Sequence, residues 1–163
     1  VPPGERGEVC VNGPQVMKGY WKRPEETADQ FVGAFLRTGD VGVMDEDGFI
    51  SIVDRIKDLI ICSGYNVYPR RVEEAIWEHR AVEEVTVIGI RDDHRGEAPK
   101  AFIKLKAGMT ATADDIRKHL EAKLSKIEMP AEIEFRAELP KTMIGKLSKK
   151  ELKAEEDARR KRR

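Results

Sequence analysis

The sequence has few cysteines, few histidines, no excess charge of either sign and no long apolar run. Cys10 and Cys62 form no CxxC pair, which argues against a disulfide scaffold or a cysteine zinc site and favours a reducing, cytoplasmic compartment. Thirty Lys and Arg residues balance thirty Asp and Glu residues. This balance argues against a globally basic nucleic-acid binder and against an acidic disordered chain. No stretch approaches the roughly 20 apolar residues of a membrane helix, so we expect no transmembrane segment.

What is present suits one folded domain, or one domain plus a piece of another. The chain has 163 residues, of which 40% are hydrophobic, enough to form a core. It opens with Val1-Pro2-Pro3-Gly4, without an initiator methionine, and strand-like sequence follows at once. We therefore expect a piece of a longer protein, which can carry part of an active site.

Strand-like and helix-like segments alternate along the chain, which predicts an α+β fold. Runs rich in β-branched residues, or alternating in polarity, predict strands at 7–12, 41–44, 49–53, 59–62, 85–90, 101–105 and 133–135. The Asp-Gly pair before Phe49 favours a hairpin. Helices are predicted at 24–31, from Pro69, from the capping residue Thr112, and over 149–163.

Two modules follow from this order. The strands of residues 1–54 need partners upstream of this chain, whereas the segment from 58 to about 152 can form a compact α+β domain. The charged cluster Asp54-Arg-Ile-Lys-Asp58 separates them.

Four short motifs could carry chemistry. A carboxylate such as Asp40, following Gly39, can accept two hydroxyl donors at once, as from a ribose. Arg55 can bind a phosphate or a sugar in a forked geometry. Gly64, in Ser63-Gly64-Tyr65, permits close approach of a ligand. Taken singly, the first motif also suits a turn, the second a solvated linker, and the third a tight turn with a packed Tyr.

The fourth motif ends at Lys146, which follows Gly145 in a segment without periodicity. A mobile loop can bring such a cation to a developing negative charge, although an ordinary surface loop has the same composition. A phosphate-binding Walker motif is ruled out because Leu147 stands where Ser or Thr is needed. The basic run at 159–163 suits a solubilising terminus better than a nucleic-acid site.

The order of the motifs is more specific than any one of them. Six segments resemble the adenylate-forming superfamily, and most closely its fatty acyl-CoA synthetases: Gly-Glu-Arg-Gly-Glu-Val (4–9), Gly-Tyr-Trp (19–21), Arg-Thr-Gly-Asp (37–40), Asp-Arg-Ile-Lys-Asp (54–58), Ser-Gly-Tyr-Asn-Val-Tyr-Pro (63–69) and Pro-Lys-Thr-Met-Ile-Gly-Lys (140–146).

The resemblance implies a domain organisation. Residues 1–54 are the last strands of a large AMP-binding domain, 55–57 are a hinge, and 58–152 are a small mobile C-terminal domain, a β-hairpin plus a three-stranded sheet with helices. Residues 153–163 are a charged tail. The family's phosphate loop and most of its acyl pocket belong to the missing N-terminal domain, so the fragment alone is expected to be inactive.

The resemblance also implies a two-step reaction. A fatty acid or other carboxylate attacks the α-phosphorus of Mg-ATP to give an acyl-adenylate, and the thiol of coenzyme A (CoA) then displaces AMP. Lys146 is implied as the catalytic cation, Asp40 and Arg55 as nucleotide contacts, and Lys57 as the hinge residue. Ser63, Gly64 and Tyr65 are implied to contact CoA after domain rotation, with Mg²⁺ held mainly outside this chain.

Two departures from the family pattern stand out. Many relatives carry Glu where Arg71 stands, and many carry Tyr-Lys-x-Pro where this chain has Ile-Glu-Met-Pro at 127–130. Both put the detailed CoA contacts in doubt. Two other functions stay open, namely an adenylation domain that loads a carrier protein and a non-catalytic binding module with the same fold.

Overall fold

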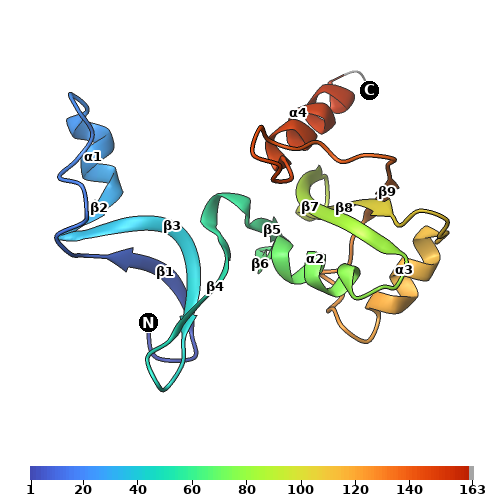
Figure 1. Ribbon diagram of the computed structural model, residues 1–163, viewed down its shortest axis with the longest axis horizontal. Helices are drawn as coiled ribbons and strands as arrows, with labels where there is room; N and C mark the ends of the chain where they lie inside the picture. The colour runs from blue at the N-terminus through green and yellow to red at the C-terminus, as the bar shows by residue number, and fades with distance from the viewer. Residues whose placement is uncertain (162–163) are drawn as a thin grey trace. The chain divides into compact units, whose positions relative to one another are not determined.

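The computed structural model describes residues 1–161 and divides into two compact units, drawn as a ribbon in Figure 1. Unit 1 is Val1–Lys57, and unit 2 begins at Asp58. The boundary falls inside the short 3-10 helix η1 (Ile56–Asp58). Each unit has its own sheet, and the two are described in turn.

Unit 1 is a four-stranded antiparallel sheet arranged around one long strand. Its elements are β1 (Arg6–Val11), α1 (Pro24–Gln30), β2 (Phe31–Val32), β3 (Phe35–Met44) and β4 (Ile50–Arg55). β1 pairs with one edge of β3, while β2 and β4 pair with the other edge. The expected hairpin is confirmed as β3–β4, where the Asp45 carboxylate accepts hydrogen bonds from the amides of Asp47 and Phe49.

Strand β3 begins earlier than the sequence predicted. The sequence predicted a strand at 41–44 and left Gly39-Asp40 open to a turn, but both residues lie within β3. Gly39 has φ +74°, a conformation that glycine adopts without strain, and the pairing of β1 with β3 shifts register between Glu8 and Cys10. The irregularity is held by Glu8, whose carboxylate accepts from the Gly39 amide at 3.2 Å and from Arg37.

Unit 2 is organised around a long hairpin. β7 (Val82–Asp92) and β8 (Gly96–Leu105) pair antiparallel, and β9 (Glu132–Phe135) joins β8 in parallel. A second hairpin, β5 (Ile60–Cys62) and β6 (Tyr65–Val67), joins this three-stranded sheet through the pairing of Cys62 with Gly96. The α+β class and the hairpin-plus-sheet architecture are therefore confirmed.

Helices pack on both faces of this sheet, because alternate residues of β8 point to opposite sides. Ala101 and Ile103 share a buried cluster with residues of α2 (Pro69–Trp77) and α3 (Ala113–Leu120). Phe102, between them, belongs to a second cluster that includes Leu152 of α4 (Lys149–Arg160). Three layers result.

The beginnings and ends of α3 and α4 agree in part with the predictions from the sequence. Thr112 caps α3 in a full capping box with Asp115, as its spacing predicted. That helix ends at Leu120, short of the predicted face, although Leu124 still packs into the core after a turn. The predicted tail helix is confirmed up to Arg160, and residues 162–163 lie outside the described part of the chain. Within residues 1–161, no helix is long and apolar enough to cross a membrane.

Candidate functional site

The predicted site residues fall into two groups, one in each unit. Asp40 and Arg55 belong to unit 1, together with the exposed Lys57 of η1. Ser63, Gly64, Tyr65 and Lys146 belong to unit 2. The groups are described separately.

In unit 1 the sheet register brings Asp40 and Arg55 together. They are opposite each other on β3 and β4, and Arg55 Nε donates to Asp40 Oδ1 at 3.0 Å. The Arg55 side chain is about half exposed and that of Asp40 about one-third exposed. Both groups therefore reach solvent, and each keeps hydrogen-bonding capacity for a polar ligand. A carboxylate beside a guanidinium suits a group that carries both hydroxyls and negative charge.

Ser63 and Gly64 form a two-residue hairpin turn between β5 and β6, and Tyr65 is the first residue of β6. Ser63 has φ +52° and Gly64 has φ +81°, the pair of positive angles typical of a tight type I′ turn. A Cβ placed on Gly64 would meet no atom of the chain within 4 Å. The space beside this glycine is thus open, and Tyr65 next to it is 63% exposed.

Lys146 lies in a loop that closes on itself. This segment, residues 141–147, is called the lysine loop below. A β-bridge joins Lys141 to Leu147, the amide of Thr142 donates to the carbonyl of Lys146 at 2.7 Å, and Gly145 turns the chain with φ +78°. Within the described range 1–161, no ion pair or hydrogen bond involves the Lys146 ammonium, and the side chain is exposed. The amine is therefore available to a ligand.

A buried lysine was missed by sequence reasoning. Lys100 on β8 is 3% exposed and lies within 3.0 Å of carboxylates of Glu132, Glu134 and Glu156. Burial opposes its charge, but the hydrogen bonds that the Lys100 ammonium donates to these carboxylates outweigh that effect and raise the pKa of Lys100. Because Glu156 is on α4 and the other two are on β9, the cluster joins the helix to the sheet. The sequence signal for this buried charge was a lysine within an otherwise largely apolar strand.

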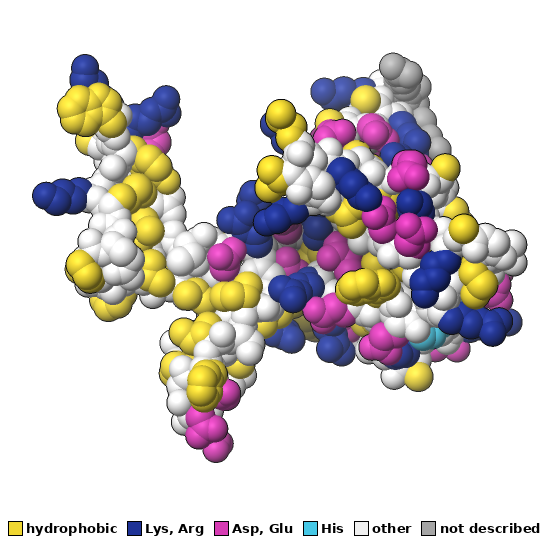
Figure 2. Space-filling view, viewed as in Figure 1, with side chains coloured by type: hydrophobic (Ala, Val, Ile, Leu, Met, Phe, Trp, Pro, Cys, Tyr) yellow, Lys and Arg dark blue, Asp and Glu magenta, His cyan; other side chains and the backbone are white. Residues whose placement is uncertain are grey.

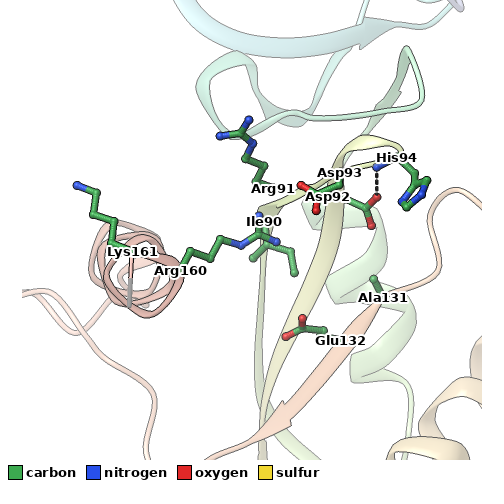
Figure 3. A pocket seen from close by; sticks show the side chains of 9 residues that line it. All are labelled: Ile90, Arg91, Asp92, Asp93, His94, Ala131, Glu132, Arg160 and Lys161. Atoms are coloured by element: carbon green, nitrogen blue, oxygen red, sulfur yellow. Dashed lines mark hydrogen bonds between the residues drawn. The ribbon is translucent and has the colours of Figure 1, made fainter. Parts of the chain in front are cut away.

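A pocket in unit 2 is lined by residues outside the four motifs that could carry chemistry. Figure 3 shows its lining, in which Arg91, Arg160 and Lys161 accompany Asp92, Asp93 and Glu132. Hydrogen bonds from the Arg95 guanidinium, with those from two backbone amides, lower the pKa of Asp92 to about 2. Positive and negative groups are mixed here, so the pocket shows no preference for an anion. Among residues 1–161 there is also no cluster of three His, Cys, Asp or Glu residues able to hold a metal.

The two departures from the family pattern face each other. Arg71 on α2 donates from Nε to Glu128 Oε1 at 2.8 Å, although 57 residues separate them. Arg71 supplies the positive group of this pair and Glu128 the negative one. The two departures are therefore in contact with each other in this chain.

Comparison with known proteins gives three findings. A model of the AMP-binding enzyme C-terminal domain matches residues 71–146. A long-chain-fatty-acid–CoA ligase of Bacillus subtilis (strain 168) is 51% identical over 154 residues, covering 94% of this chain and 28% of that protein. A 2-succinylbenzoate–CoA ligase of Geobacillus kaustophilus is 45% identical and covers 93% of this chain and 31% of that protein.

Solved structures share the fold. ATP-bound MatB from Rhodopseudomonas palustris has a TM-score of 0.92 and 36% identity over 97% of this chain and 32% of its own. The amide bond synthetase McbA from Marinactinospora thermotolerans has a TM-score of 0.88 and 40% identity over 94% of this chain and 32% of its own. The chain therefore spans less than a third of the relatives it matches.

Proposed function

Residues 71–146 belong to the AMP-binding enzyme C-terminal domain family, and from this premise we propose that the chain is the C-terminal part of a fatty acid–CoA ligase. The whole enzyme would activate a carboxylate with ATP to an acyl-adenylate and transfer the acyl group to CoA. The carrying observation is the 51% identity to a long-chain-fatty-acid–CoA ligase over 94% of the chain. The residues of the site are consistent with both half-reactions.

In the first half-reaction a carboxylate oxygen attacks the α-phosphorus of ATP and pyrophosphate leaves. An anion approaches a polyanion, so a cation at the reacting oxygens is needed to offset repulsion and stabilise the transition state. Lys146, exposed and without an ion-pair partner among the described residues, supplies it. Asp40 accepts hydrogen bonds from the ribose hydroxyls, while Arg55, held beside it at 3.0 Å, contacts ribose or phosphate. Mg²⁺ accompanies ATP, with its ligands mainly outside this chain.

In the second half-reaction the CoA thiol attacks the acyl carbonyl carbon and AMP leaves. Lys146 must withdraw, which rotation of unit 2 about Lys57 at the unit boundary achieves. The same rotation brings the Ser63–Tyr65 turn to the pantetheine. The open space beside Gly64 supports this role, because a side chain there would narrow the path of the thiol.

The test uses the whole enzyme with Lys146→Ala, and Lys150→Ala is its control because Lys150 is an exposed lysine on α4. Pyrophosphate release on mixing with fatty acid and ATP should fall by roughly 100-fold or more. Thioester formation from supplied acyl-adenylate and CoA should be retained. Equal loss of both half-reactions would refute the role of Lys146.

The same assay separates the alternatives. Transfer to a carrier protein in place of CoA would indicate a carrier-loading adenylation domain, and the lack of any adenylate would indicate a non-catalytic module. The two unpaired cysteines, one buried and one exposed, are consistent with a cytoplasmic enzyme.

A further inference from the structure

Two ion pairs join the lysine loop and the residues just after it to the rest of unit 2. The two ends of the loop, at residues 141 and 147, are called its arms. On one arm, the Lys141 ammonium lies 2.5 Å from Glu84 of β7. Just past the other arm, the Lys149 ammonium lies 2.8 Å from Glu73 of α2. The two carboxylate side chains are only 22% and 20% exposed, so these pairs are less screened by solvent than ordinary surface pairs.

Each carboxylate is itself fixed. Glu73 Oε1 also accepts from the amide of Val87 at 2.8 Å, so its position is set by the backbone of β7. Glu84 Oε2 is buried and, within the described chain, has no hydrogen-bond partner. The Lys141 ammonium, on the other oxygen, is therefore the contact that balances this carboxylate.

The loop transmits the position of its arms to Lys146. Leu139 and Leu147 beside the arms pack against the second core cluster, and the Ser148 amide donates to the Pro140 carbonyl at 2.8 Å. Within the loop, the β-bridge joins its two ends, and the amides of Gly145 and Lys146 both donate hydrogen bonds to Thr142. A shift at either arm therefore moves the Cα of Lys146.

We propose that Glu73 and Glu84 are positioning residues for Lys146, clamping the lysine loop through Lys149 and Lys141. The proposal rests on the role of Lys146 in adenylate formation. A long flexible lysine stabilises a transition state only if its backbone presents the ammonium at the reacting oxygens, and small misplacements have large costs in rate. The clamp should matter to adenylate formation and not to thioester formation.

The kinetic test compares Glu84→Gln and Glu73→Gln in the whole enzyme with Glu78→Gln. Glu78 is the matched control: it also forms an ion pair in unit 2, but its partner, Lys123, is not part of the lysine loop or next to it. Adenylate formation should fall roughly 10- to 100-fold in the first two variants, with thioester formation from supplied acyl-adenylate unchanged. The charge swap Lys141→Glu with Glu84→Lys should recover part of the loss. Equal decreases in both half-reactions, or values equal to the control, overturn the proposal.

Hydrogen exchange tests the clamp without reference to catalysis. In the same variants of the whole enzyme, the amides of Thr142, Gly145 and Lys146 should exchange several-fold faster, while those of β7 and β8 stay protected. Unchanged exchange at these three amides overturns the clamp. If exchange rises but Lys146→Ala forms adenylate normally, the proposed function fails instead, and the positioning role fails with it.

Discussion

The two units contain similar β-rich sequence but differ in where their apolar side chains lie. Unit 2 buries two clusters, one against α2 and α3 and one against α4. Among the described residues of unit 1, Val41 is the single buried hydrophobic residue, whereas Trp21 is 86% and Phe49 72% exposed. Figure 2 shows hydrophobic side chains over the surface of unit 1. Unit 2 therefore supplies its own core, and the unit 1 sheet has apolar faces that call for a further surface.

Separating the units gives the largest expected effect. A polypeptide of residues 58–163 should fold alone and unfold in one cooperative transition, because its helices cover both faces of its sheet. Residues 1–57 alone should not, since they bury too little apolar area. Circular dichroism during heating and the dispersion of amide NMR signals would measure this. A cooperative transition in the 1–57 polypeptide would contradict the comparison.

Buried charge should also distinguish the units. Lys100→Gln leaves three carboxylates close together without their cation and should destabilise unit 2 by about 3–5 kcal/mol. Arg55→Gln removes one partner of an exposed ion pair in unit 1 and should cost less than about 1 kcal/mol. Urea unfolding of the whole chain checks both values. A similar cost for the two would show that the Lys100 cluster is effectively solvated.

How much of this could be read from the sequence depends on the distance between partners. The β3–β4 hairpin and the Thr112 cap were predicted because their determinants lie within a few residues. The length of β3 was not predicted, because Gly39 suggested a turn. The hydrogen bond from the Gly39 amide to Glu8, on the neighbouring strand, explains how a glycine with positive φ stays in the sheet.

The candidate site shows the same limit. Motif order pointed to Lys146, and the exposed ammonium is consistent with that prediction. The sequence also suggested a mobile loop, but it could not reveal the clamp, because Glu84 is 57 residues from Lys141. Likewise, Arg71 and Glu128 looked like two separate departures until the fold placed them in contact.

Acid should destabilise unit 2 through the carboxylates that surround Lys100. Burial opposes the charge of Glu134, but hydrogen bonds from Arg159, Arg136 and Lys100 outweigh it and lower the pKa to about 2, against an ordinary value of 4.5. With a lower pKa in the folded state, the carboxylate stabilises the fold above pH 4.5, and this contribution is lost as the pH falls toward 2. The urea concentration at the midpoint of unfolding should therefore decrease as the pH is lowered from 4.5 to 2. Glu134→Gln should flatten that dependence, and an unchanged slope would exclude this group as its source.

Trimming one methyl group compares the apolar faces directly. Ile76 on α2 is fully buried, so Ile76→Val should destabilise unit 2 by about 1 kcal/mol. Ile52 on β4 is 45% exposed, and Ile52→Val should be close to neutral in this chain. Both are measured by urea unfolding. If Ile52→Val is costly in the proposed whole enzyme but not in this chain, a surface outside this chain covers β4.

The smallest expected change in stability concerns the two Arg–carboxylate pairs whose arginine side chains are about half exposed, one pair in each unit. Arg71→Glu places a like charge beside Glu128 and should cost about 0.5 kcal/mol. Adding Glu128→Lys should restore the stability, because the pair then has opposite charges again with their positions exchanged. A double-mutant cycle on stability measures the coupling, and thioester formation with CoA measures function. If the double variant matches the parent in both, the departures are a structural exchange of charge without consequence for CoA. Exchanging Asp40 and Arg55 in the same way should instead abolish adenylate formation at unchanged stability, because that pair is proposed to meet the nucleotide.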